Sequence, residues 1–265
     1  MTTTVLDPAA PDWGRLYRAG SVSAAVAVVL YVAALVMVVV TAAPPEAGGV
    51  AILEYVDAHR TGYVVRQLLW TAPNLFLMVA FLALAVSLRS QGRSLVAIAG
   101  MVAVTSWAVP LAWPTTGDGS LAMVVLSDRY ADAATASERA SFVAGAEVLD
   151  ALNDVPAVIG VLQTLGLLLV SLLMLRGTFS RRLAWLGVVA GAVGIGSEVL
   201  RPVLGWAYGV YGLLLFAWLA WLAVALWRLP GGRDPARDAP SASGGASGRS
   251  SAAPSAGARD PLPSP

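Results

Sequence analysis

Six long apolar stretches constrain the fold of this 265-residue chain more than any other feature. About 20 residues of α-helix cross a hydrocarbon core about 30 Å thick, and each stretch is close to that length. No charged residue lies in the central half of any stretch. A transmembrane barrel would instead show short alternating strands. We therefore predict an all-α polytopic transmembrane bundle with six spans, at residues 21–41, 64–88, 94–113, 155–175, 183–200 and 203–227.

The composition supports a membrane protein and excludes several kinds of chemistry. The chain is 57% apolar and 12% charged, with a mean hydropathy of +0.72, whereas soluble domains have about 25% charged residues. It has no cysteine, no lysine and a single histidine, His59, which excludes thiolate metal sites, Schiff bases and bis-histidine haem. A net charge of +1 gives no electrostatic reason to bind nucleic acid. We expect no cofactor and no metal.

The arginines are distributed unevenly between the connectors, and this predicts the orientation. Twelve of the 17 arginines lie on the side of the N-terminus, and five lie on the opposite side together with eleven of the 16 acids. The positive-inside rule then places both termini in the cytoplasm. Because every basic residue is an arginine and Ala, Gly, Pro and Val are abundant, we expect a bacterial cell membrane.

The chain divides into a cytoplasmic N-terminal segment (1–19), a six-helix transmembrane domain (20–229) and a cytoplasmic tail (230–265). The tail is rich in Pro, Ser, Ala and Gly, which predicts disorder. Arg15 and Arg18 before the first stretch, with small residues after it, also resemble a signal peptide. A stretch of about 20 residues exceeds the usual apolar region of 7–15, so we expect a retained anchor. Cleavage would leave five spans in the same orientation.

The connectors on the side opposite the termini contain predicted helices of their own. Thr135-x-x-Glu138 is a capping box, and the residues after it are apolar at helical spacing up to the fourth stretch. Shorter helices are predicted at about 121–131 and within 49–63. These segments are expected to form a small cap over the bundle.

Small residues predict close helix contacts in the last two stretches. Gly187-x-x-x-Gly191 and Gly205-x-x-x-Gly209 are spacings that allow helix backbones to approach each other in lipid. The connector between the two stretches is short, so we predict that they pack as a tight hairpin. The same pattern can also serve a homodimer, and the oligomeric state is left open.

Polar and charged residues converge on the ends of three stretches that face the predicted cap. Asp150 and Asp154 are four residues apart, so they share a helix face. The candidate ligand-binding residues, from three antiparallel helices, are Arg66, Asn74, Asp150, Asp154, Gln163, Glu198 and Arg201. Three interpretations stay open: a structural ion-pair clamp, an outward-facing pocket for a polar small molecule, and a proton relay.

The residues before the first stretch resemble a known family. Leu16-Tyr17-Arg18-Ala19-Gly20 is similar to the YRxxG-type opening of an uncharacterised family of bacterial six-span integral membrane proteins, with one residue fewer before the glycine. The outer loop that leads to Arg66 is a second shared feature, and the resemblance covers about residues 15–229. It implies the six-span architecture but no activity.

The sequence predicts a non-enzymatic integral membrane protein whose partners are the lipid bilayer and a polar small molecule from the outer side. The alternative is a small-molecule or ion transporter that uses the outer charge cluster. Against it, no ionisable residue lies near the middle of a span, where transporters bind their substrates. A membrane enzyme is a third class, but no histidine accompanies the carboxylates and no catalytic residue can be assigned.

Overall fold

The computed structural model describes residues 13–45, 48–112, 115–116, 119–154, 158–177, 179–201, 203 and 205–229, without the side chains of residues 115, 153, 154 and 205. The chain separates into two units, Met1–Gly232 and Arg233–Pro265, and only the first contains described residues. The predicted tail, 230–265, therefore lies outside the described part of the chain.

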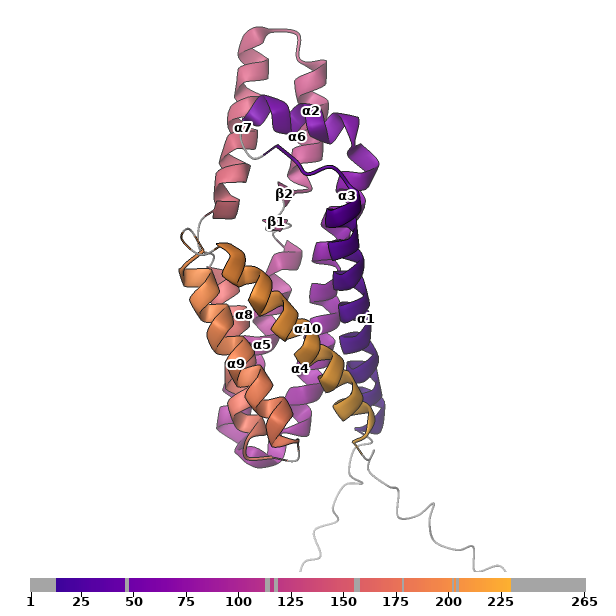
Figure 1. Cartoon of the computed structure of the whole chain (residues 1–265), viewed down its shortest axis with the longest axis vertical. Helices are drawn as coiled ribbons and strands as arrows, with labels where there is room; N and C mark the ends of the chain where they lie inside the picture. Colours follow the sequence, from indigo (N-terminus) through magenta and orange to yellow (C-terminus); the bar gives the residue numbers. More distant parts are fainter. Residues whose placement is uncertain are drawn as a thin grey trace, which may run out of the picture. The chain divides into compact units, whose positions relative to one another are not determined.

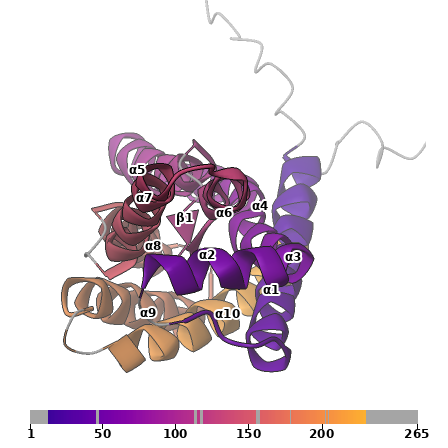
Figure 2. The same ribbon diagram turned by 90° about the horizontal axis from the view of Figure 1, so that it is seen from above.

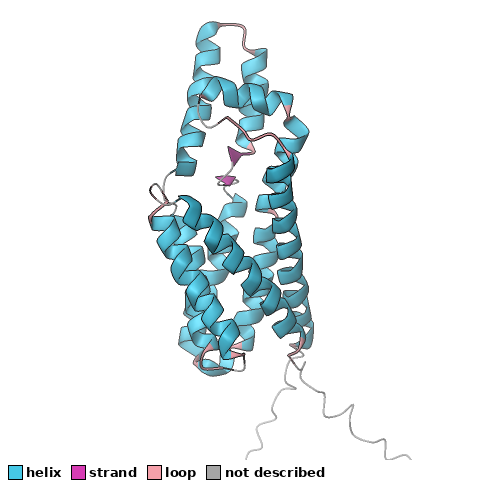
Figure 3. Ribbon diagram, viewed as in Figure 1, coloured by secondary structure: helices cyan, strands magenta, loops and turns pink. Residues whose placement is uncertain are grey.

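Helices make up almost all of the described structure (Figure 3). In chain order the α-helices are α1 (Gly14–Val40), α2 (Gly49–Ala58), α3 (Arg60–Thr71), α4 (Pro73–Ser87), α5 (Arg93–Ala112), α6 (Ala122–Asp132), α7 (Ala136–Asp154), α8 (Val158–Met174), α9 (Arg181–Val199) and α10 (Gly205–Trp227). A 3₁₀ turn, η1 (Arg89–Gln91), precedes α5, and a two-stranded antiparallel hairpin, β1 (Thr115–Thr116) and β2 (Gly119–Ser120), follows it. The prediction of an all-α chain did not include this hairpin.

Six of the helices form a closed ring (Figures 1 and 2). Each packs against two others in the order α1, α4, α5, α8, α9, α10 and back to α1. Five segments are long and apolar enough to cross a membrane: α1, the joined α3–α4 segment Arg60–Ser87, α5, α9 and α10. The remaining member, α8, is apolar but only 17 residues long. The helices coincide with the predicted stretches, and large apolar side chains on their outer faces are exposed.

Aromatic side chains fill the interior of the helix ring. Phe81 of α4 stacks on Trp107 of α5 with ring centroids 6.1 Å apart, and on Trp218 of α10 at 5.7 Å. Trp218 is fully buried. Tyr31 of α1 stacks on Phe216 of α10 at 5.1 Å. Rings contributed by four helices therefore fix how those helices face one another.

The glycines of α9 make close contacts, but their main neighbour differs from the predicted one. A Cβ at Gly191 would lie 2.8 Å from Cβ and 2.9 Å from the backbone of Leu168 on α8. Gly187 and Gly194 face α8 as well, and they also touch α10 through Trp218 and Tyr211. A Cβ at Gly209 or Gly212 of α10 would have no neighbouring atom within 4 Å. The predicted α9–α10 contact exists, whereas the idea that the glycines of both helices create it was wrong.

The connectors at one end of the ring form a compact substructure, which we call the cap: α2, β1, β2, α6 and α7 (Figure 1). Its own apolar core is separate from the core of the ring and consists of Ile52, Leu53, Val56, Tyr63, Met123 and Ala146. The predicted capping box of α7 is confirmed. Glu138 N–H donates to Thr135 Oγ1 at 3.2 Å, and Thr135 N–H donates to Glu138 Oε2 at 3.1 Å.

Candidate functional site

A polar pocket of about 310 Å³ lies where α1 ends and α2 turns into α3. The turn is sharp because α2 ends at Ala58 and α3 begins at Arg60, with His59 between them. The lining residues are Thr41, Tyr55, Asp57, Ala58, His59, Arg60, Thr61, Gly62, Tyr63 and Arg66. Of the residues predicted from the sequence, this set contains Arg66.

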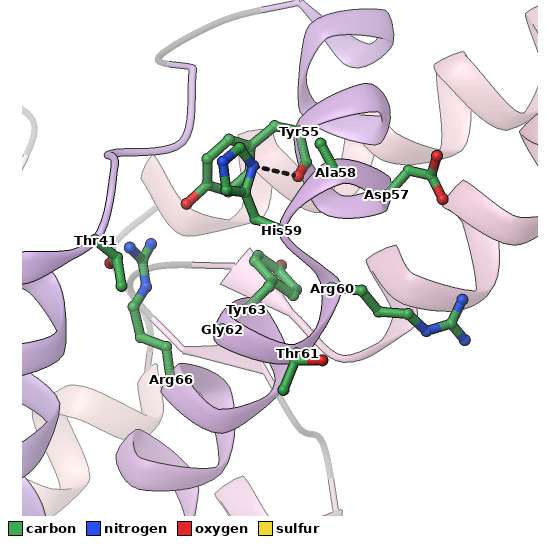
Figure 4. Close-up of a pocket in the computed structure, with 10 residues that line it drawn as sticks. All are labelled: Thr41, Tyr55, Asp57, Ala58, His59, Arg60, Thr61, Gly62, Tyr63 and Arg66. Atoms are coloured by element: carbon green, nitrogen blue, oxygen red, sulfur yellow. Dashed lines mark hydrogen bonds between the residues drawn. The ribbon is translucent and has the colours of Figure 1, made fainter.

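Arg66 brings a buried positive charge to the pocket. Arg66 is 2% exposed and lies on the second turn of α3, below the α2–α3 turn. Figure 4 shows its guanidinium beside Thr41 and on the same side of α3 as the rings of Tyr55 and His59. Arg60 and Asp57 extend to the other side of the turn. On the Arg66 side, the pocket is therefore lined by the guanidinium group, which already takes part in a further interaction, and by aromatic rings, while the acidic side chain of the lining is directed away.

His59 is held in one orientation by Tyr55. The two rings stack at 4.5 Å, and His59 Nδ1 lies 3.1 Å from the Tyr55 carbonyl oxygen. Because a carbonyl can only accept a hydrogen bond, Nδ1 carries the proton and Nε2 remains for other partners. The Tyr55 hydroxyl donates to the Ala42 carbonyl at 2.5 Å and so ties α2 to the chain that follows α1. These contacts fix the upper wall of the pocket.

The cap holds the opposite side of α3 through directional polar contacts. The Tyr63 hydroxyl donates to the Ser120 carbonyl and accepts from the Ser120 N–H, both at 3.0 Å. Thr116 Oγ1 donates to Gln67 Oε1 at 2.7 Å. Gly119, with φ of 134°, leaves no room for a Cβ beside the Tyr63 hydroxyl, so the hairpin lies close against α3. Arg60 forms a bidentate ion pair with Asp128 of α6.

Asn74 and Gln163 make contacts with helix backbones. Asn74 is buried and its amide donates to the Thr71 carbonyl at 2.8 Å. This contact spans the joint at Pro73, where the missing N–H interrupts the helical hydrogen-bond pattern. The Gln163 amide on α8 donates to the Ser106 carbonyl on α5 at 3.3 Å. The Asn74 amide therefore supports the α3–α4 joint, and the Gln163 amide supports the packing of α8 against α5.

Glu198 and Arg201 lie together at the C-terminal end of α9. Glu198 is 1% exposed, and Arg201 Nη1 lies 3.8 Å from its Oε1. The Arg201 guanidinium also stacks over the Tyr208 ring at 4.9 Å. A Cβ at Gly160 would be 2.6 Å from Glu198 Cδ, so the carboxyl group packs directly against α8. The geometry is that of an ion pair that fixes α8, α9 and α10 together.

Asp150 and Asp154 belong to the C-terminal part of α7. Asp150 is partly buried and engages in polar interactions, whereas the side chain of Asp154 lies outside the described part. The structure thus brings Glu198 to Arg201 and places Arg66 in a pocket lined from α1, α2 and α3. Within the described residues, no group of three His, Asp or Glu side chains could hold a metal ion.

Several pocket residues were not among the predicted set: Thr41, Tyr55, His59 and Tyr63. The available signal was that His59, Tyr63 and Arg66 lie close together in the sequence, after an apolar stretch. That pattern shows which residues are near one another along the chain, but it does not show that α2 folds back over the end of α1.

Comparison with known proteins adds no further constraint. No protein family model, curated protein or solved structure matches this chain.

Proposed function

We propose that this chain is a six-span integral membrane protein that binds a small anionic molecule in the pocket above α3. The observation that carries the proposal is Arg66, a buried arginine that lines a pocket of about 310 Å³ together with His59, whose Nε2 is left for other partners. Thr41, Tyr55 and Tyr63 complete the lining, and their hydroxyls donate to backbone carbonyls. Ligand pockets typically combine this size with a few fixed polar groups. A guanidinium presents N–H donors in the planar arrangement that a carboxylate or phosphate accepts.

The membrane topology belongs to the same proposal. Five segments meet the length and hydropathy needed for spans, and α8, with 17 residues, is at the short limit for a hydrocarbon core. Twelve arginines on the side of the termini support a cytoplasmic location for both ends in a bacterial cell membrane. The pocket then faces outward. The resemblance to the bacterial six-span family supports the same architecture.

The test is ligand-induced stabilisation of the purified protein in detergent. Acetate and inorganic phosphate are the anionic probes, and choline is the cationic control. We expect the anions to raise Tm in a concentration-dependent way and choline to leave it unchanged. Arg66→Gln should abolish the shift, because it removes the charge that faces the pocket.

Arg60→Gln is the matched control, since Arg60 also lines the pocket but extends away from Arg66 and pairs with Asp128. It should preserve the response to anions. Loss of the response in both variants would show a general surface-charge effect and contradict the proposal. His59→Gln provides a milder change on the same wall and should weaken the response without abolishing it.

A further inference from the structure

The end of the ring opposite the cap is rich in arginines. Among the described residues of its connectors and helix ends there is no Asp or Glu, while the arginines are Arg15, Arg18, Arg89, Arg93, Arg176, Arg181, Arg182 and Arg228. These segments lie together. Arg89 stacks over the Trp13 ring at 5.1 Å, and a Cβ at Gly177 would be 3.2 Å from the Gln91 amide. We call this region the arginine end.

A groove of about 540 Å³ between α4 and α5 opens at the arginine end. Its walls are apolar, as at Leu82, Val86 and Met101, and its two charged residues, Arg89 and Arg93, lie at one end of the groove. A Cβ at Gly100 would be 2.8 Å from the Ala85 Cβ, so the two helices are closest at small residues. Larger side chains on either side of that contact form the walls.

The two arginines are placed to meet a ligand in the groove. Arg89 is exposed to solvent but restrained by its stacking on Trp13. Arg93 is the first residue of α5, a helix of 20 residues, and the N-terminal end of a helix adds positive potential. A phosphodiester at this position would face two guanidinium groups and a helix N-terminus.

We propose that this groove is a binding site for one anionic glycerophospholipid. The phosphate would contact Arg89 and Arg93, and an acyl chain would lie along Leu82, Val86 and Met101. The combination of charge and apolar walls matches the two parts of such a lipid, and basic pockets between transmembrane helices are known to select anionic headgroups. A zwitterionic lipid is disfavoured because its ammonium group would meet arginines and no described carboxylate. The site is independent of the pocket above α3.

The first experiment compares lipids on the detergent-solubilised full chain. We expect phosphatidylglycerol to raise Tm more than phosphatidylcholine does, and native mass spectrometry to retain one phosphatidylglycerol. Arg89→Gln/Arg93→Gln should weaken this binding about thirtyfold, since each arginine near an anionic lipid surface contributes about fivefold. The control Arg181→Gln/Arg182→Gln removes the same charge from the same end and should preserve the selectivity.

A second pair of variants tests the groove and keeps all the arginines. Ala97→Phe fills the groove and should reduce phosphatidylglycerol binding, whereas Ile98→Phe changes an exposed neighbour that does not line it. This pair of variants tests the lipid site even if the double arginine variant does not fold. Equal stabilisation by the two lipids, equal loss in the Arg181/Arg182 control, or full stabilisation by glycerol phosphate alone would overturn the proposal.

Discussion

The cap and the ring of helices are held together by different means, although one chain builds both. In the cap, an apolar core is supplemented by directional contacts such as Ser127 Oγ to the Leu53 carbonyl and the Tyr63–Ser120 pair. In the ring, backbones approach each other at glycines, as at Gly191 against Leu168, and aromatic rings stack in the interior. Exposed valines and leucines cover much of the outside of the ring.

The contrast is what the proposed topology predicts, in which the ring faces lipid and the cap faces water. In water, burying apolar surface drives association, and a hydrogen bond fixes the register of the cap helices. In lipid, the surroundings are as apolar as the side chains, so close packing at small residues contributes more of the stabilisation. Substitutions that remove packing should therefore affect the ring most, and substitutions that remove polar contacts should affect the cap.

The largest effect is expected from Gly191→Leu in the ring. The new side chain would displace the backbone of α8, and overpacking of this kind costs about 3 kcal/mol. Thermal unfolding in detergent should show a clear fall in Tm. Gly196→Leu on the same helix is the control, because nothing lies within 4 Å of a Cβ there. Equal losses in the two variants would show that helix propensity, and not the contact with α8, is responsible.

The next effect is expected from Tyr63→Phe at the junction of cap and α3. It removes the hydroxyl that both donates to and accepts from Ser120, at a cost of about 2 kcal/mol. Hydrogen exchange should accelerate at α2 and α6 with little change in the ring. Tyr130→Phe, which alters a cap tyrosine with no described hydrogen bond, should leave exchange unchanged. If exchange rises equally in the ring, the two regions do not unfold separately.

A smaller effect within the cap is expected from Ser127→Ala. The buried hydroxyl donates to the Leu53 carbonyl at 2.7 Å, and losing the bond should cost about 1 kcal/mol. Limited proteolysis of the α2–α3 turn gives a suitable readout. The comparison variant is Ser141→Ala, whose exposed hydroxyl bonds within its own helix. Equal proteolysis of both variants would argue against the α2–α6 contact as the cause.

The smallest effect is expected from Arg60→Gln. The ion pair with Asp128 is well aligned, but its side chains are 52% and 42% exposed, so water screens it and its loss should lower stability only slightly. Cap stability, followed by hydrogen exchange, should differ between wild type and variant at low salt and converge at high salt. Arg139→Gln, an exposed arginine on α7, controls for the change in net charge. A difference that persists at high salt would mean that more than the ion pair was lost.

The sequence predicted local structure well. The lengths of the apolar stretches indicated the ring helices, and Thr135 and Glu138 gave the capping box of α7 in the right place. Both depend on residues a few positions apart, whose spacing along a helix is fixed by helix geometry. The same regularity identified the glycine face of α9.

The arrangement of the helices could not be predicted in the same way. Spacing shows that Gly187 and Gly191 share a face, but it does not say whether α8 or α10 lies against that face. The sequence prediction also grouped Arg66 with Glu198, because both residues lie near helix ends at the same predicted level of the membrane. The pocket instead forms from the contacts of Arg66 and Tyr55 with their neighbours on α1–α3, which depend on how α2 folds back.

The length of the α3–α4 segment sets the depth of the pocket. Its 28 residues extend about 42 Å at about 1.5 Å each, well beyond a hydrocarbon core of about 30 Å. Counted back from Ser87, about 20 residues cross that core and reach Leu68. In the proposed topology, Arg66 then lies about 3 Å beyond that core. An ion from the aqueous phase would reach its guanidinium without entering hydrocarbon.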